Sequence, residues 1–157
     1  MQKLDIAELK DFINKQGPDT RVYIGCDSYR RKLNGIWNAY YTVVVVVHMN
    51  GRNGCRVFGD ITHEPDYDQK KNRPAMRLMN EVYKAVALFE ELLPVIGERE
   101  VELHLDINPN KKHGSSCVVE QAIGYVKGVL GVVPKVKPEG FAATHCADHF
   151  RTHFGRT

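Results

Sequence analysis

The sequence lacks the features that mark membrane-spanning, zinc-knuckle and repeat proteins. Its most apolar run, Val43–Val47, has five residues, whereas a membrane-spanning helix needs about 20. The four cysteines form no CxxC pair, which is a common spacing in small zinc sites. No internal repeat or low-complexity segment is present. We therefore expect no membrane association and no zinc knuckle.

The composition is that of an ordinary globular protein. The chain has 157 residues, a single-domain length, and 43% of them are hydrophobic and 26% charged. The formal net charge of +3 permits a polyanionic partner without requiring one. No signal peptide is recognised, so free thiols in a reducing cytoplasm are the simplest expectation for the cysteines.

The hydrophobic pattern predicts an α/β domain with an extra helix at its N-terminus. Five consecutive valines are stiff at χ1 and favour a central strand that is buried on both faces. Three hairpin-connected strands followed by crossover units predict a mixed five-stranded sheet in the order β-β-β-α-β-α-β-α. We expect one domain over residues 1–157, with the extra helix within 1–18 and the core within 21–154. The predicted elements are a helix at 4–14, strands at 21–28, 37–48 and 55–62, a helix at 75–93, a strand at 100–107, a helix at 115–130, a strand at 132–136 and a helix at 141–154.

Three aspartates occupy related positions in this scheme. Asp27 lies at the predicted end of the first strand, and Asp106 lies near the end of the fourth. If these strands are parallel neighbours, both carboxylates project into one crevice. Asp148 lies on the last helix, which can close over that crevice. Each residue also has a structural alternative, as a turn former, an edge-strand residue or a surface helix residue.

Clustered carboxylates indicate a bound cation. An ionised carboxylate beside an apolar strand, such as Asp27, is costly to desolvate unless a positive charge lies next to it. Ligation by oxygen alone favours Mg²⁺ or Mn²⁺ over zinc. Two such ions about 4 Å apart promote in-line hydrolysis of phosphodiester bonds.

These residues and their surroundings resemble a known family. The order of elements, with the three aspartates at these places, is similar to the ribonuclease H-like fold. Within it, three segments resemble the YkuK-like branch, a family of predicted ribonuclease H-like nucleases: GCDS at 25–28, HLDI at 104–107 and VKPEGFAA at 136–143. The resemblance covers about Val22 to Phe150. It implies a ribonuclease H-like fold and a nuclease reaction more firmly than a substrate.

One position departs from the pattern that the resemblance implies. Ribonuclease H-like enzymes usually add a glutamate from the first helix after the third strand, and Arg77 stands where that glutamate is expected. Glu81 is one turn further on the same helix face, and we take it as the candidate fourth carboxylate. Weaker candidates precede the helix: Glu64, Asp66 and Asp68.

The loop after Asp106 carries candidate substrate-binding residues. Lys111, Lys112 and His113 lie just before a predicted helix start. Lysines and the amides of a helix N-terminus bind phosphate, and His113 could transfer a proton at neutral pH. A solvated charged loop is the alternative.

Histidine and aromatic residues elsewhere have simpler interpretations. A stripe on the last helix favours exposed surface histidines over a transition-metal site, and it consists of His145, His149 and His153. Three aromatic residues of the second strand could stack on bases, but core or cross-strand packing is the commoner role; they are Trp37, Tyr40 and Tyr41.

The sequence thus favours a nuclease that depends on Mg²⁺ or Mn²⁺ and acts on RNA, an RNA–DNA hybrid or structured DNA. Asp27, Asp106 and Asp148 are the expected metal ligands, and Glu81 joins them as a catalytic residue. The alternative is a non-catalytic nucleic-acid-binding module that has the fold without the full metal chemistry.

Overall fold

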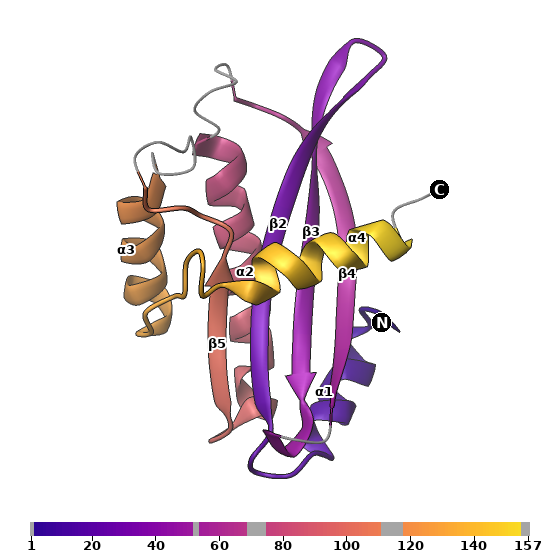
Figure 1. Ribbon diagram of the computed structural model, residues 1–157, viewed down its shortest axis with the longest axis vertical. Helices are drawn as coiled ribbons and strands as arrows, with labels where there is room; N and C mark the ends of the chain where they lie inside the picture. The colour runs from indigo at the N-terminus through magenta and orange to yellow at the C-terminus, as the bar shows by residue number, and fades with distance from the viewer. Residues whose placement is uncertain (1, 52–53, 69–74, 111–117, 155–157) are drawn as a thin grey trace.

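A computed structural model describes residues 2–51, 54–68, 75–110 and 118–154 of the chain. Five strands form one mixed sheet in the order β1-β4-β3-β2-β5 (Figure 1). The strands are β1 (Gln2–Lys3), β2 (Arg21–Leu33), β3 (Ile36–His48), β4 (Cys55–Pro65) and β5 (Glu100–Leu105). The helices are α1 (Ile6–Asn14), α2 (Ala75–Ile96), α3 (Val119–Leu130) and α4 (Ala147–Phe154), and a π-helical segment, Ala142–Cys146, leads into α4. The mixed α/β fold that the sequence predicts is confirmed.

A long hairpin of β2 and β3 dominates the sheet. Its two-residue turn has positive φ at both Asn34 (50°) and Gly35 (80°), the backbone that Asn-Gly favours because it matches the twist of the strands. Every residue from Arg21 to Leu33 is paired with β3. The strands predicted at 21–28 and 37–48 are therefore longer than expected, and most of the segment between them belongs to the hairpin. In Figure 1 the hairpin extends well beyond the other elements.

The two faces of the sheet are covered unequally. The larger core lies between the sheet and the helices α1, α2 and α3, and includes Leu9, Val82, Phe89 and Val126. The opposite face is crossed by the π-helical segment and α4 (Figure 1), which bury a smaller cluster around Val44 and Phe150. None of the helices in the described part of the chain is long and apolar enough to cross a membrane.

The fifth strand differs from the expected one. The predicted strand at 132–136 forms only a single bridge, in which the backbone N–H and C=O of Lys135 bond to β5. Pro134 and Pro138 flank this bridge, and proline has no N–H to donate to a ladder. β5 is therefore one edge of the described sheet, and the opposite edge is β1, which pairs with β4 in parallel at Gln2 and Lys3.

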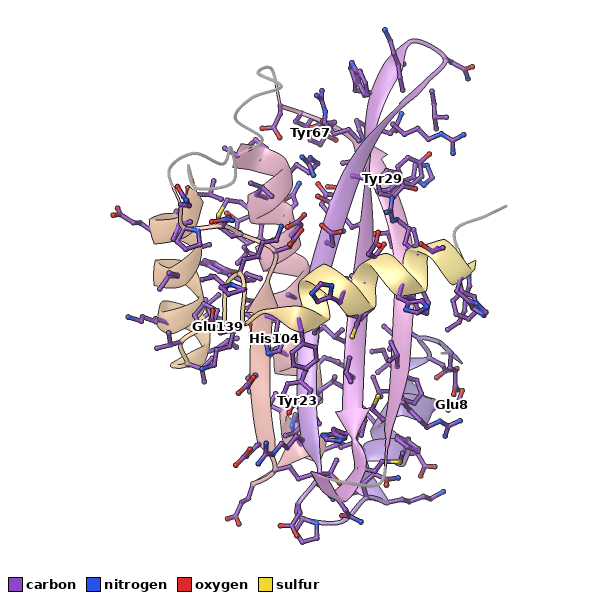
Figure 2. The ribbon with its side chains drawn as sticks, viewed as in Figure 1. Glu8, Tyr23, Tyr29, Tyr67, His104 and Glu139 are labelled. Atoms are coloured by element: carbon purple, nitrogen blue, oxygen red, sulfur yellow. The ribbon has the colours of Figure 1, made fainter. Side chains whose placement is uncertain are left out.

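A buried histidine anchors the segment that leads into α4. His104 of β5 is fully buried, and its Nδ1 accepts a hydrogen bond from the N–H of Ala142 at 3.0 Å. Its Nε2 contacts Glu102 at 2.8 Å. Its ring lies against Tyr23 and Phe141 (Figure 2). These contacts fix the start of the π-helical segment beside β5.

Candidate metal centre

The site begins where β5 ends. The parallel pairing of β2 with β5 stops at Cys26 and Leu105. Asp27 follows Cys26, and Asp106 follows Leu105, so the two aspartates come directly after the last paired residues. The parallel neighbours that the sequence prediction required are therefore present. Asp27 does not end its strand, however, because the hairpin with β3 carries β2 on to Leu33.

Asp27 and Asp106 interact directly through their side chains. The pKa of Asp27 is raised from 3.8 to about 8, first by burial and then by a side-chain hydrogen bond with Asp106 and by that group's negative charge. Lys137 Nζ lies 2.9 Å from Asp106 Oδ1, and the Asp106 side chain is only 17% exposed. Two carboxylates in contact share a proton when no cation is bound.

Glu81 brings a third carboxylate to this region from α2. Its side chain is 2% exposed, and Ser28 Oγ donates a hydrogen bond to its Oε1. Its other oxygen, Oε2, is buried and has no hydrogen-bond partner among the residues that the structure describes. Burial raises the pKa of Glu81 well above its ordinary value, and the charge of Asp27 raises it further. Such a lone oxygen needs a donor or a cation.

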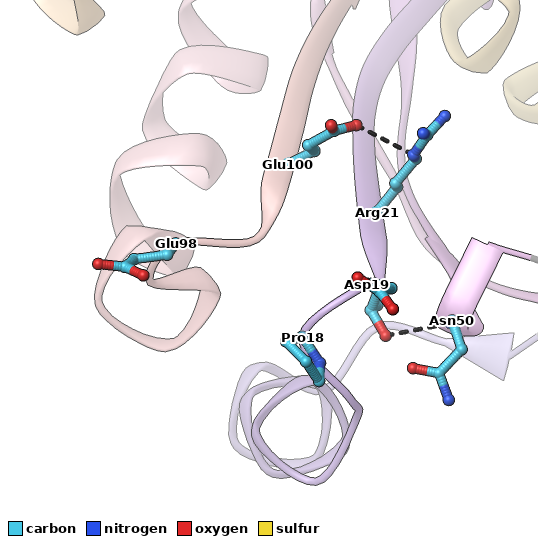
Figure 3. A pocket seen from close by; sticks show the side chains of 7 residues that line it. Pro18, Asp19, Arg21, Asn50, Glu98 and Glu100 are labelled. Carbon is cyan, nitrogen blue, oxygen red and sulfur yellow. Dashed lines mark hydrogen bonds and ion pairs between the residues drawn. The ribbon is translucent and has the colours of Figure 1, made fainter.

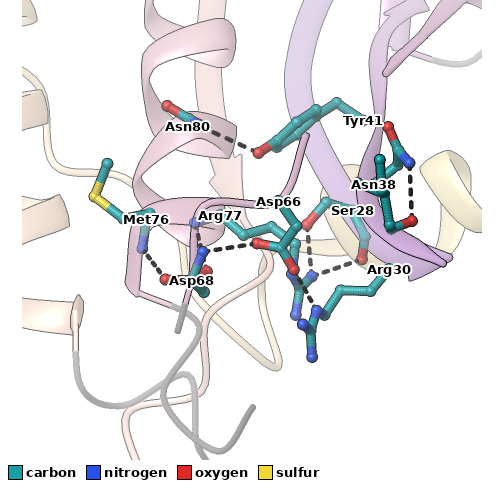
Figure 4. A network of polar contacts seen from close by, with 10 residues as sticks. Ser28, Arg30, Asn38, Tyr41, Asp66, Asp68, Met76, Arg77 and Asn80 are labelled. Carbon is teal, nitrogen blue, oxygen red and sulfur yellow. Dashed lines mark hydrogen bonds and ion pairs between the residues drawn. The ribbon is translucent and has the colours of Figure 1, made fainter. Parts of the chain in front are cut away.

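Arg77 does not take the place of Glu81 at the site. It contacts Ser28, which holds Glu81. Its Nη1 donates to the backbone oxygen of Ser28 at 3.1 Å and to Ser28 Oγ at 2.7 Å (Figure 4). The positive charge of Arg77 opposes the effect of burial on the pKa of Glu81. Ser28 thus links the two side chains that lie one helical turn apart on α2.

The acidic residues before α2 have other partners. Asp66 pairs with Arg30, and the two carboxylate oxygens of Asp68 accept the N–H groups of Met76 and Arg77 at the start of α2 (Figure 4). Glu64 accepts from Asn80 at 3.1 Å. These contacts give Glu64, Asp66 and Asp68 roles in the local structure.

Asp148 lies at the start of α4, and its side chain is 55% exposed. It is ion-paired with Arg151, one turn further on the same helix. The charge of Arg151 lowers the pKa of Asp27, against the larger effects of burial and Asp106. The arginine of this pair therefore faces the carboxylate site, a contact that the sequence pattern did not reveal.

The carboxylates are the kind of ligand that a magnesium or manganese ion prefers, but they are not arranged to coordinate one. Mg²⁺ and Mn²⁺ prefer carboxylate oxygen, and no described residue bonds Glu81 Oε2. Within the described ranges, no three His, Cys, Asp or Glu side chains form a group that would hold an ion as they stand. Asp27 and Asp106 bond each other, and Glu81 bonds Ser28. To coordinate an ion, these side chains must turn away from their present partners.

Comparison with known proteins identifies the family of the chain. The family model described as ribonuclease H-like matches residues 5–152. The chain belongs to the ribonuclease H-like family. No curated protein and no solved structure matches it significantly.

A cavity adjoins the carboxylates of this ribonuclease H-like protein. It has a volume of about 460 Å³, and its lining includes Asn108, Asn110, Lys137 and His145. Lys137 therefore connects the cavity to Asp106. The sequence interpretation missed Lys137, although its segment is part of the motif at 136–143.

Other residues predicted for the site are accounted for as follows. The phosphate-binding candidates Lys111, Lys112 and His113 lie outside the described residues. The histidines of the last helix segment are all exposed, as expected: His145, His149 and His153. A second cavity, of about 480 Å³, lies at the other end of β2, where Arg21 pairs with Glu100 (Figure 3).

Proposed function

We propose that this ribonuclease H-like protein is a nuclease that depends on Mg²⁺ or Mn²⁺ and hydrolyses phosphodiester bonds in RNA, an RNA–DNA hybrid or structured DNA. The observation that carries the proposal is the convergence of Asp27, Asp106 and Glu81. Burial and the neighbouring carboxylates raise the pKa values of Asp27 and Glu81. Asp27 bonds Asp106, and the charges of both raise the pKa of Glu81, although Asp106 is also paired with Lys137.

The residues have separable roles in this proposal. Asp27, Asp106 and Asp148 would hold the cation, Asp148 after leaving Arg151, and Glu81 would approach through its unpaired oxygen. Bound Mg²⁺ or Mn²⁺ would activate the attacking water and stabilise the leaving oxygen. Ser28, itself held by Arg77, would orient Glu81 by donating to its other oxygen.

Substrate contacts would come from the basic residues beside Asp106. Lys137 Nζ, 2.9 Å from Asp106, would meet the phosphate next to the one that is cleaved. Lys111, Lys112 and His113 remain proposed phosphate contacts on the strength of the sequence. The motifs at 25–28, 104–107 and 136–143 support a place in the YkuK-like branch of predicted nucleases.

The second candidate is a nucleic-acid-binding module without catalysis. Two observations favour it: no three ligands are grouped for an ion in the described residues, and Arg77 lies where the family's glutamate is expected. In this case Asp27 and Asp106 would remain a proton-sharing pair.

Cleavage assays separate the two candidates. Labelled RNA, RNA–DNA hybrid and branched DNA are incubated with the protein in Mg²⁺, in Mn²⁺ and in EDTA. We expect cleavage with either metal and none in EDTA. Asp27→Asn should abolish it, because an amide is a weak ligand for a hard cation.

Asp19→Asn is the matched control, since Asp19 is an exposed aspartate at the far end of β2. It should retain full activity. Activity that persists in Asp27→Asn would defeat the nuclease assignment to this site. Binding of nucleic acid without cleavage by the wild type would favour the binding module.

A further inference from the structure

Three rings form a row across the sheet next to the carboxylates. Tyr29 of β2 lies opposite Tyr40 of β3, which lies opposite His63 of β4. The ring centroids are 5.0 Å apart for Tyr29 and Tyr40 and 5.2 Å apart for Tyr40 and His63, with interplanar angles of 12° and 19°. Arg151 covers the outer face of Tyr29, with its guanidinium carbon 4.7 Å from the ring centroid. We call Tyr29, Tyr40 and His63 the aromatic row.

The aromatic row shares a face with Asp27. Side chains two residues apart on a strand point to the same side, about 7 Å apart, so Tyr29 lies next to Asp27 on β2. Arg151 confirms this placement, because it contacts Tyr29 and also acts on the charge of Asp27. Figure 2 shows Tyr29 on the hairpin beside α4.

Cross-strand packing alone does not account for the surroundings of the row. Its outer end, His63, is exposed, and both tyrosines are only half-buried. The hairpin tip between the two tyrosines, residues 29–40, contains three basic residues and no acidic one. Of these, Arg31 is exposed and is two residues beyond Tyr29, on the same face. At the hairpin tip this face therefore carries aromatic rings and an exposed positive charge.

We propose that the aromatic row and Arg31 bind a single-stranded nucleic acid whose backbone passes the carboxylate site. The inference rests on the proposed function and adds the class of substrate to it. Unpaired bases stack on aromatic side chains while basic residues follow the backbone. Tyr40 is stacked between Tyr29 and His63, and Arg151 covers Tyr29, so the exposed ring of His63 offers the open face for a base. A duplex keeps its base faces covered and offers mainly phosphates and groove edges.

The spacing agrees with a strand that occupies both places at once. His63 lies two strands from Tyr29, about 10 Å across the sheet, and Asp27 lies about 7 Å from Tyr29 along it. The resulting separation of about 12 Å corresponds to about three or four stacked nucleotides at about 3.4 Å each. A phosphate at the carboxylates and a base on His63 thus belong to nucleotides about three or four steps apart on one strand.

The test is oligonucleotide binding in EDTA, where no cleavage interferes. Fluorescence anisotropy measures the affinity for single-stranded RNA, single-stranded DNA and a duplex of the same length. Tyr40→Leu should weaken binding of single strands by about tenfold or more, because it removes the ring that holds His63 in its stacking orientation. Tyr40→Phe, which keeps the ring, should bind like the wild type.

Trp37→Leu is the matched control. Trp37 is also on β3, but an odd number of residues from Tyr40, so it points to the opposite face, where Arg30 covers its ring at 4.5 Å. It should leave binding of single strands unchanged. His63→Ala alters the exposed end of the row with less risk to folding, and it should weaken binding in the same direction as Tyr40→Leu.

Three results would overturn the inference: equal losses in Trp37→Leu and Tyr40→Leu, no loss in Tyr40→Leu and His63→Ala, or tighter binding of the duplex than of single strands. A loss limited to RNA or to DNA supports it and identifies the sugar. Failure of the nuclease proposal is distinct, because it appears as absent cleavage in Mg²⁺ and leaves this binding pattern intact.

Discussion

Replacement of Asp27 by asparagine should stabilise the metal-free protein at neutral and alkaline pH. Asp27 has a pKa of about 8 in the folded protein, against 3.8 as its ordinary value. Between these two values the folded state binds one more proton than the unfolded state, so stability must fall as pH rises. The contribution is complete below about pH 4 and is lost above about pH 8. Asp27→Asn cannot ionise and should not show this loss.

The size of the effect follows from the shift. One pKa unit corresponds to about 1.4 kcal/mol, so a shift from 3.8 to about 8 sets an upper value of about 6 kcal/mol. Asp106 shares the proton and side chains relax on ionisation, so a difference of about 2–4 kcal/mol at alkaline pH is our expectation. At a typical slope of about 2 kcal/mol per M, this moves the urea midpoint by about 1–2 M.

Urea denaturation in EDTA, followed by circular dichroism from about pH 5 to about pH 9, measures the difference. The wild type should lose stability over this range relative to Asp27→Asn, and Asp19→Asn should follow the wild type. Added Mg²⁺ should restore the wild type at alkaline pH and leave Asp27→Asn unchanged, because ligands that bind only the folded state stabilise it. Parallel pH profiles for wild type and Asp27→Asn would refute the reasoning, since the buried carboxylate would then carry no excess proton.

Three further predictions concern other parts of the site and its support. Glu81→Gln should lower metal-dependent cleavage by about 100-fold or more while raising metal-free stability at neutral pH, measured by kinetics and urea denaturation; unchanged cleavage would remove Glu81 from the mechanism. Lys137→Gln should reduce the slope of log affinity against log salt by about one, because one phosphate contact is lost next to Asp106; an unchanged slope places Lys137 away from the substrate. Gly59→Ala should destabilise the protein by about 1–3 kcal/mol in thermal unfolding, because its Cβ would lie 2.8 Å from the Phe150 ring that holds α4 on the sheet; a neutral effect would show that α4 can shift freely.

Much of the fold can be predicted from the sequence because the patterns that specify its elements are local. The valine run in β3, the apolar spacing of α2 and the alternation in β5 each specify an element by their own residues. The short strand β1 and the single bridge at Lys135 cannot be predicted in this way. Gln2 and Lys3 form β1 only because the exposed edge of β4 offers them partners, and Pro134 leaves a bridge where a strand is expected.

The site can be predicted from the sequence only in part, for a related reason. Strand order identifies Asp27 and Asp106, since parallel neighbours bring equivalent positions together. The partners of a helix side chain depend on its rotation and on the neighbouring strand, which periodicity alone does not fix. Glu81 and Arg77 share one helix face, and only Ser28 determines how they are arranged. Asp148 has the expected helix position, yet its nearest charge is Arg151.

Unequal strand lengths have a consequence for solubility. Beyond Cys26, where the pairing with β5 ends, the outer side of β2 is an open strand edge in the described part of the sheet. Open edges recruit strands from other chains unless charged side chains discourage it. Arg30, Arg31 and Lys32 lie on this edge, so their charges also disfavour self-association through it. Neutral residues at all three positions should promote aggregation through this edge even though the core is untouched.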